Sequence, residues 1–548
     1  ATDELREEHT IRAWLQNPPA GVEVLTVSPL EVEEVESVVH SMLGGELALG
    51  PLAFELHRET RGNPLFIAET IRGLVERESL QPLRDEAGEV TGWRFVLPEA
   101  HGSSATLGHT MRDLLAERFN HLPDQAQDML ERIAVLGRPC SYEWLRLATG
   151  LEEEPLLDTI DHLLARRILV ERKGPRSSIF SFFHQQMAEV VRDRLEPGRK
   201  LALHLEVADA WVKVLGNSDA ASVEVLATQL FLGESYTLAI PYLLLAAEGR
   251  MRLGLYESAY RMLQDALVCV REEASIEPRL FATTHLRLGV VSQHLNEPEQ
   301  AWEHLRIAYK TAQQCNFADL QGQALYILAR LTSRQGDFAA SCKHYTEAIR
   351  IQRVAQDHTG ALRSLNGLGG SLWYLGDLPH ARRLFEDSVA AARRLEDGGL
   401  MAQATNGLGL VAMHEGRYSD AISSFIEASV MSRSTGRDAF YLLCQLHESE
   451  VRRLQGDLGT ARALAASVVE RLERVGEREA LAFGLNVQAA IALEIRDFDK
   501  VERYLIRSGE YLQRIPHHFN RAVRQLLVGQ LELARGRPAE AQLGLSEA

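Results

Sequence analysis

Apolar and small residues recur at helical spacing through the second half of the chain, and this pattern repeats every forty residues. From about residue 185 onward the segments favour helices, because apolar residues fall three and four apart without strand-like alternation. The turns that open the repeated phrase are Asn296, Gly336, Gly376, Gly416, Gly456, Arg496 and Gly536. A period of this size predicts a stack of helix pairs, which presents a surface for binding rather than a pocket for catalysis.

The N-terminal third has shorter and more varied patterns. Residues 20–28 predict a strand, and residues 31–43 carry apolar positions at helical spacing. Gly62-Asn63-Pro64 predicts the start of a helix, since proline is tolerated at the first helical position. Residues 81–108 alternate and are rich in Gly and Ser, so we expect a strand or hairpin followed by a loop.

Residues 110–196 predict three helical stretches followed by a basic hairpin, which is the winged-helix pattern. The expected helices lie at 110–119 with 123–137, at 141–149 and at 153–166, and the hairpin lies at 167–184. Its arginines could contact DNA, but the third helix is acidic where it would face phosphates. We therefore do not expect nucleic acid as a partner, and favour docking within the molecule.

The composition is that of a folded protein, with 45% hydrophobic and 25% charged residues. A net charge of −17 argues against binding to nucleic acid or anionic membranes. The five cysteines are far apart, which favours a reducing compartment, and no apolar run is long enough to span a bilayer. We expect a cytoplasmic protein with no membrane partner. The acidic start, without Met, suggests a piece of something longer.

The repeat around Gly376 resembles the tetratricopeptide repeat. Its small residues and its aromatic residue fall at that family's positions: Gly369, Ala381, Phe385 and Ser388. The match is good at Gly376 and Gly416 and weak at Gly456 and Arg496, and the period is longer than the family's usual one. The resemblance covers about residues 220–548 and implies a right-handed α-solenoid.

Three segments of the first half resemble STAND ATPases, the signalling ATPases with numerous domains. They are the motif at 61–66 with the helix after it, the segment LTVSPLEVEEVESVV before it, and residues 180–211. The resemblance implies a helical lid domain in which Gly62 and Pro64 contact nucleotide and Arg58 or Arg61 senses phosphate. The alternative, which is favoured for this chain alone, is that Gly-Asn-Pro simply starts a helix.

The residues that would carry chemistry are absent from the sequence. No Gly-x-x-x-x-Gly-Lys-Ser/Thr loop exists to cradle phosphates, and no set of catalytic or metal-binding residues is apparent. We expect this chain to be no enzyme and to hold no cofactor. ATP or ADP with magnesium belongs, by the resemblance, to a nucleotide-binding core upstream of residue 1, which makes the parent an ATPase.

Binding is predicted on the inner face formed by the first helix of each pair. Counting helical positions places there Tyr326, Arg330, Arg334, Arg363, Asn366, Trp373, Tyr374, Gln403, Asn406 and His414. Arginine and asparagine can bind a peptide carboxylate or backbone, and aromatic rings supply buried area. We expect a protein, a peptide or a small-molecule inducer on this face; the alternative is a solvated face without a partner.

We therefore predict a mainly α protein with a helical domain, a winged helix and a tetratricopeptide-like solenoid. The expected boundaries are 1–80 for the end of the nucleotide core and the lid, 81–109 for a linker or hairpin, 110–196 for the winged helix and 197–548 for the superhelix. The resemblance is to regulators like the maltose-regulon activator and to ATPase–repeat regions of bacterial receptor-type Ser/Thr kinases. It implies that the repeats sense a partner and relieve autoinhibition of an upstream nucleotide switch. A repeat adaptor without nucleotide switching is the alternative.

Overall fold

The structure is a computed structural model. It describes residues 28–43, 50–60, 62–76, 80–84, 90–95, 118–174, 178–215, 220–273, 275–513 and 518–547. The strand expected at 20–28 and the helix expected at 110–119 lie almost wholly outside the described residues. The chain forms two compact units, residues 1–216 and residues 217–548, and each is described by itself.

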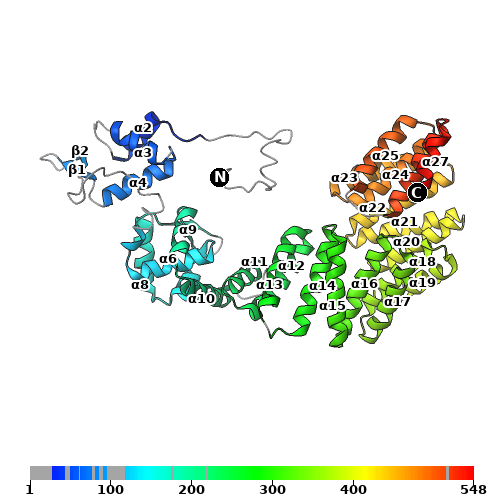
Figure 1. Cartoon of the computed structure of the whole chain (residues 1–548), viewed down its shortest axis with the longest axis horizontal. Helices are drawn as coiled ribbons and strands as arrows, with labels where there is room; N and C mark the ends of the chain where they lie inside the picture. The colour runs from blue at the N-terminus through cyan, green and yellow to red at the C-terminus, as the bar shows by residue number, and fades with distance from the viewer. Residues whose placement is uncertain are drawn as a thin grey trace. The chain divides into compact units, whose positions relative to one another are not determined.

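The first unit begins with a small helical domain closed by a hairpin (Figure 1). Its elements are α2 (Val32–Leu43), α3 (Gly50–Thr60), α4 (Pro64–Glu76), β1 (Leu80–Arg84) and β2 (Val90–Phe95). Val35, Ile67 and Ile71 are buried in one core with Leu80 of the hairpin. The Trp93 indole in β2 packs on this core, and its Nε1–H donates to the Leu43 carbonyl at 2.8 Å. The hairpin is thus part of the helical domain's core.

The winged helix follows and is confirmed. Its helices and strands are α6 (Asp124–Leu136), β3 (Cys140–Ser141), α7 (Tyr142–Thr149), α8 (Glu153–Ala165), β4 (Leu169–Lys173) and β5 (Ser178–Phe182). The wing is an antiparallel sheet of strand order β3-β5-β4. Sequence reasoning missed β3, because two residues are too short for alternation to register.

Two further helices complete the first unit, α9 (Gln185–Arg194) and α10 (Pro197–Leu215). Helix α10 packs against α6 and α7, and Arg132 of α6 forms an ion pair with Glu206 of α10 at 2.5 Å. Arg199 of α10 reaches back to Asp128 of α6 at 2.6 Å. These contacts place α10 in the first unit, although the predicted superhelix begins at residue 197.

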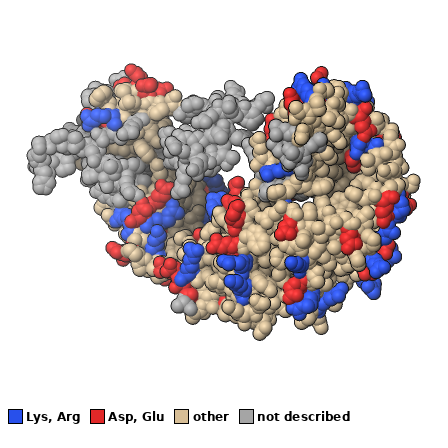
Figure 2. All heavy atoms as spheres, turned by 45° about the vertical axis from the view of Figure 1, so that its right-hand side comes forward, with Lys and Arg blue, Asp and Glu red and all other residues tan. Residues whose placement is uncertain are grey.

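The third helix of the winged helix exposes an acidic surface. Glu153, Glu154, Asp158 and Asp161 of α8 are all exposed. On the face drawn in Figure 2, Lys and Arg intermingle with Asp and Glu rather than gathering in one basic patch. Whether nucleic acid is a partner stays a prediction.

The second unit is a solenoid of helix pairs, as predicted. Its helices are α11 (Ala220–Leu232), α12 (Tyr236–Arg252), α13 (Tyr256–Glu272), α14 (Pro278–His294), α15 (Pro298–Gln314), α16 (Ala318–Arg334), α17 (Phe338–Val354), α18 (His358–Tyr374), α19 (Leu378–Arg394), α20 (Gly398–His414), α21 (Tyr418–Ser434), α22 (Asp438–Leu454), α23 (Leu458–Val475), α24 (Arg478–Glu494), α25 (Phe498–Gln513), α26 (His518–Ala534) and α27 (Pro538–Glu547). The even-numbered helices from α14 on are the inner helices, and the odd-numbered ones are the outer helices.

The periodic turn residues share one backbone conformation. All seven have positive φ: Asn296, Gly336, Gly376, Gly416, Gly456, Arg496 and Gly536. Residues at the turns between the pairs share it as well: Asn316, Gln356, Glu396, Gly436 and Gly476. Left-handed backbone favours glycine, so the glycines mark many of these turns in the sequence. The turn therefore recurs every twenty residues, twice per repeat.

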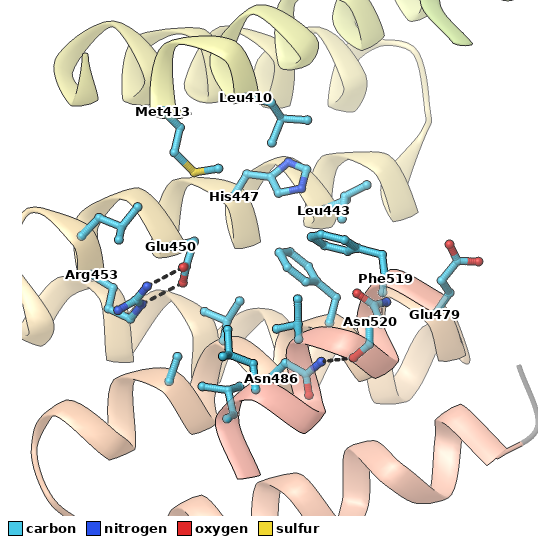
Figure 3. A pocket seen from close by; sticks show the side chains of 18 of the residues that line it. Leu410, Met413, Leu443, His447, Glu450, Arg453, Glu479, Asn486, Phe519 and Asn520 are labelled. Carbon is cyan, nitrogen blue, oxygen red and sulfur yellow. Dashed lines mark hydrogen bonds and ion pairs between the residues drawn. The ribbon is translucent and has the colours of Figure 1, made fainter. Parts of the chain in front are cut away.

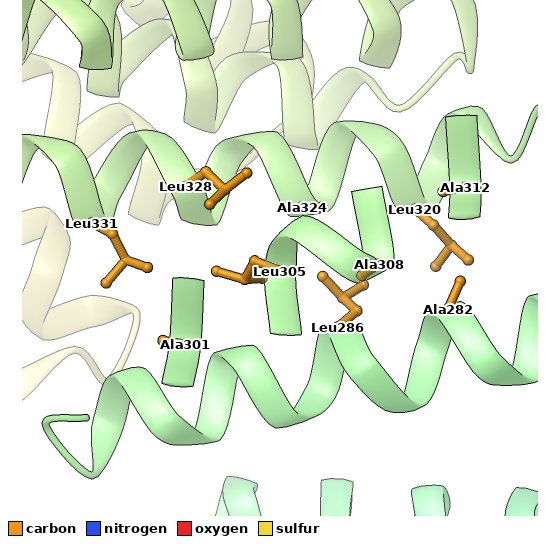
Figure 4. Packing of buried hydrophobic residues seen from close by; sticks show 10 residues of the cluster. All are labelled: Ala282, Leu286, Ala301, Leu305, Ala308, Ala312, Leu320, Ala324, Leu328 and Leu331. Carbon is orange, nitrogen blue, oxygen red and sulfur yellow. The ribbon is translucent and has the colours of Figure 1, made fainter. Parts of the chain in front are cut away.

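Packing between the pairs depends on large side chains that contact glycines. The Phe385 ring of α19 lies so close to Gly369 and Gly407 that a Cβ on either would meet it at 2.8 Å or 2.4 Å. One ring thus fills the space between its own pair and the next, as the sequence predicted. Leucines take this role earlier: Leu305 of α15 is buried between Leu286 of α14 and Leu328 of α16 (Figure 4).

The solenoid curves until inner helices far apart in sequence touch. Arg334 at the end of α16 forms an ion pair with Glu479 at the start of α24. The Tyr374 ring at the end of α18 stacks on Phe338 and lies 5.1 Å from the Phe519 ring of α26. Figure 1 shows the corresponding turn of the helix row. We call Arg334, Phe338, Trp373, Tyr374, Glu479 and Phe519 the clasp.

Candidate binding pocket

A cavity of about 1010 Å³ lies inside the curve, next to the clasp. Its walls come from the inner helices α20, α22, α24 and α26, with Trp373 and Tyr374 of α18 closing one side. Most of the lining is apolar, including Phe483 and the residues Leu410, Met413, Leu443 and Phe519 that Figure 3 labels. Ligand pockets in proteins are concave and mainly apolar, with a few polar groups that fix orientation.

His447 is the polar group at the centre of these apolar walls. Its ring lies between Leu410 and Met413 on one side and Leu443 on the other (Figure 3). Burial lowers the pKa of His447 to about 4, so the ring is neutral at physiological pH. Its Nδ1 lies 2.9 Å from the Asn406 Oδ1, which only accepts, so Nδ1 carries the proton. The lone pair is then on Nε2.

Carboxylates lie at both ends of the pocket. Arg453 at one end forms ion pairs with Glu450, at 2.6 Å, and with Glu494. Glu477 and Glu479 lie at the other end, at the start of α24. The lining thus holds four carboxylates against one guanidinium. It is therefore acidic overall, and the neutral His447 adds no positive charge.

The clasp joins the pocket to the basic part of the inner face. Burial is the largest cause that lowers the pKa of His294, and the charges of Arg330 and Arg334 lower it further. The two arginines thus create a local positive field at the ends of α14 and α16. Arg334 carries this charge to Glu479 on the pocket rim. Burial and the Glu479 charge together raise the pKa of Tyr374 to about 12, so its phenol remains protonated.

Four residues from the predicted inner face line the pocket: Trp373, Tyr374, Asn406 and His414. The Trp373 Nε1–H donates to the His414 Nδ1 at 3.1 Å, which links α18 to α20. The structure brings these residues together on one wall. Whether they contact a partner stays a prediction.

The remaining predicted residues lie elsewhere on the inner helices. Arg334 belongs to the clasp, and the Arg330 guanidinium lies over the Tyr326 ring at 5.9 Å. Arg363 is exposed, and Gln403 is partly buried. Neither Arg363 nor Gln403 is among the residues that line the cavity.

Asn366 has its polar atoms occupied by the fold. Its Nδ2 donates to the Leu400 carbonyl at 3.3 Å, and its Oδ1 accepts from the Ser388 hydroxyl. The amide therefore ties α18 to α19 and α20. This contact accounts for Asn366 without any partner.

Sequence reasoning missed most of the pocket, although the period could have found it. Adding eighty residues to Trp373 gives Arg453, and adding the same to Arg363 and Asn406 gives Leu443 and Asn486. All three of these residues line the cavity. The prediction stopped at His414 because the repeat pattern weakens around Gly456 and Arg496, while the helices themselves continue.

The segment predicted to contact nucleotide forms a tight turn in the first unit. Gly62 has φ of +70°, and its carbonyl accepts from the Leu30 N–H at 2.8 Å. Pro64 begins α4, and Arg58 forms an ion pair with Glu55 at 2.5 Å. Arg61 lies outside the described residues. These contacts account for Gly62 and Pro64 structurally, and their role toward nucleotide stays a prediction.

Two features of the described residues concern membranes and metals. None of the described helices is long and apolar enough to cross a membrane. Within the same residues, no group of three or more His, Cys, Asp or Glu side chains is arranged to hold a metal ion.

Comparison with known proteins places the fold. The tetratricopeptide repeat family model matches residues 320–394. A STAND protein with a tetratricopeptide repeat sensor from Pyrococcus horikoshii is similar in structure over 96% of this chain and 73% of its own, with a TM-score of 0.54 and 12% identity. The chain shares the fold of a STAND protein with a repeat sensor. The resemblance stated from the sequence is therefore confirmed at the level of fold.

Other solved structures are similar over a smaller part of the chain. Aspartyl phosphate phosphatase F from Bacillus subtilis covers 72% of this chain and 96% of its own, with 12% identity and a TM-score of 0.46. A Rap protein complexed with competence and sporulation factor covers 70% of this chain and 99% of its own, with 13% identity and a TM-score of 0.37. No curated protein matches the chain.

Proposed function

We propose that this chain is the sensing and regulatory region of a STAND-type ATPase, in which the solenoid binds a partner and relieves inhibition of a nucleotide switch. The pocket beside the clasp carries this proposal, because it opens onto residues from distant repeats. An occupant there contacts α18, α20, α22, α24 and α26 at once. Binding energy can therefore bias the curvature of the solenoid.

The fold shared with a STAND protein that has a repeat sensor supports the switch. In this proposal a nucleotide-binding core acts in cis with residues 1–216 and holds ATP or ADP with magnesium. Gly62, Pro64 and the arginines at 58 and 61 belong to the lid that closes on the nucleotide. The proposed output, transcription or protein-kinase signalling, follows from the same resemblance, and the proposed cytoplasmic location follows from the composition.

The experiment is a deletion in the intact parent protein. Removing residues 217–548 should raise the rate at which a fluorescent ADP analogue is released, because the inhibitory contacts are lost. A parent lacking only α26 and α27 (518–547) serves as a matched truncation that opens the pocket but leaves most of the solenoid. Unchanged release after the larger deletion would contradict the switch.

The second candidate is an adaptor that assembles proteins without a nucleotide switch. Its support is the solenoid itself, since repeats of this kind supply extended binding surfaces. An adaptor retains partner binding in every nucleotide state. Partner affinities that are equal with ATP and with ADP would therefore favour it over the switch.

A further inference from the structure

The ligand chemistry of the pocket can be read from its walls, given the proposed sensing function on which this inference rests. We propose that the pocket takes a short peptide segment that is apolar in its middle and carries a basic group at an end. The neutral His447 ring accepts a hydrogen bond from an N–H of this peptide. The acidic ends of the cavity select its charge.

The size of the cavity accommodates a short peptide segment. Pockets for drug-sized ligands occupy roughly 300–1,000 Å³. This cavity of about 1010 Å³ is at the top of that range, and four inner helices contribute to its walls. It has room for several adjoining side chains, and the aromatic rings of Phe440, Phe483 and Phe519 offer flat apolar surface to them.

The charge of the ends favours a cation. Glu450 and Glu494 share the single guanidinium of Arg453, which leaves net negative charge at that end. The C-terminal ends of α22 and α24 lie there as well, and helix C-termini attract cations. At the opposite end Glu477 is exposed, and among the described residues no ion pair or side-chain hydrogen bond engages it.

His447 disfavours a negatively charged ligand. Its Nδ1–H is directed to Asn406, so the group left for a ligand is the Nε2 lone pair. An N–H of a peptide matches this acceptor. A carboxylate ligand would meet an acceptor at His447 and an excess of carboxylates at the ends of the pocket, which disfavours it relative to a cation.

The test is a selection that leaves the sequence of the peptide open. A display library of random nonapeptides is panned on the full 548-residue chain, and the recovered peptides are synthesised with a fluorescent label. Binding is titrated by anisotropy at low salt on the native chain, Glu477→Gln, His447→Leu and Glu510→Gln. Glu510, which is exposed on the outer helix α25, is the matched control for the loss of one carboxylate.

The expected peptides are apolar in the middle and have net positive charge. Glu477→Gln should raise the Kd about two- to fivefold, the range for one exposed charge pair, and less at high salt. His447→Leu should raise it about three- to tenfold through the lost hydrogen bond. Glu510→Gln should leave it unchanged.

The outcomes distinguish a failure of this inference from a failure of the proposed function. Peptides that are acidic or uncharged, yet weakened by His447→Leu, would overturn the proposed ligand class while leaving a ligand-binding pocket in place. Peptides indifferent to both pocket variants, or no recovered peptides, would overturn the pocket as a peptide site. The deletion experiment on nucleotide release tests the switch independently of either result. Circular dichroism of each variant checks that the helices remain folded.

Discussion

Gly409 of α20 should be intolerant of a single added methyl group. A Cβ at this position would lie 2.6 Å from the Phe425 ring, and Phe425 is fully buried. Carbon atoms in favourable contact are about 3.5–4.0 Å apart, so the ring or the backbone must shift by about 1 Å. Overpacking of this kind costs about 1–3 kcal/mol. Replacing glycine by alanine inside a helix returns about 0.5–1 kcal/mol.

The net expectation for Gly409→Ala is a destabilisation of about 0.5–2 kcal/mol, or roughly two- to thirtyfold in a local opening equilibrium. Gly370→Ala is the matched control, because Gly370 lies within the neighbouring inner helix α18 and nothing would lie within 4 Å of its Cβ. That substitution should stabilise its helix by up to about 1 kcal/mol.

The assay must resolve single repeats, since a solenoid unfolds in parts and a global midpoint averages over them. Hydrogen exchange followed by mass spectrometry gives this resolution. Peptides from residues 398–434 should exchange faster in Gly409→Ala, and peptides from residues 278–314 should not change. Faster exchange in both variants, or in neither, would refute the argument that the Phe425 ring makes Gly409 necessary.

Three further predictions address the clasp, the pocket and the first unit. Arg334→Glu and Glu479→Arg should each weaken the clasp, and the double swap should restore it. The coupling energy should be about 0.2–1 kcal/mol, because both side chains are partly exposed. A double-mutant cycle on urea unfolding measures this coupling energy. In the folded chain the pKa of His447 is lowered from 6.5 to about 4, so between these values the unfolded chain binds a proton that the folded chain does not. Stability should therefore fall as pH drops from about 6.5 toward 4. His447→Gln should reduce this dependence of the melting temperature on pH. Gly62→Ala should destabilise the helical domain by about 2 kcal/mol or more, because a Cβ would meet the Leu30 carbonyl oxygen at 2.2 Å at a positive φ; near-ultraviolet circular dichroism during melting would detect the loss.

The regular part of the fold could be predicted from the sequence because its signals are local. Glycine at Gly336, Gly376 and Gly416 marks turns with positive φ, and small residues such as Ala381 mark close helix contacts. Arg496 shows the limit of this reasoning: it adopts φ of 61° in the same turn, but its residue type gives no hint of it. Periodicity identified that turn when propensity could not.

The clasp could not be predicted, because it depends on the curvature of the whole solenoid. Arg334 and Glu479 are 145 residues apart, and their contact follows from small rotations accumulated over several helix pairs. No local sequence pattern predicts the total of these rotations. The pocket shares this dependence, since Trp373 and Phe519 reach it from opposite ends of the same turn.

The inner asparagines show how a binding residue could be told from a structural one. Asn486 repeats the arrangement of Asn366: its Oδ1 accepts from Ser508, as that of Asn366 does from Ser388, twenty-two residues after each asparagine. Asn406 lacks this partner, because the equivalent position is Ala428, and its Oδ1 is directed to His447 instead. Without the serine, the Oδ1 of an inner asparagine is available to bind another side chain, as that of Asn406 binds His447. The interval between asparagine and serine is visible in the sequence. It identifies Asn406 as the asparagine that orients a pocket side chain, whereas Asn366 and Asn486 hold neighbouring helices together.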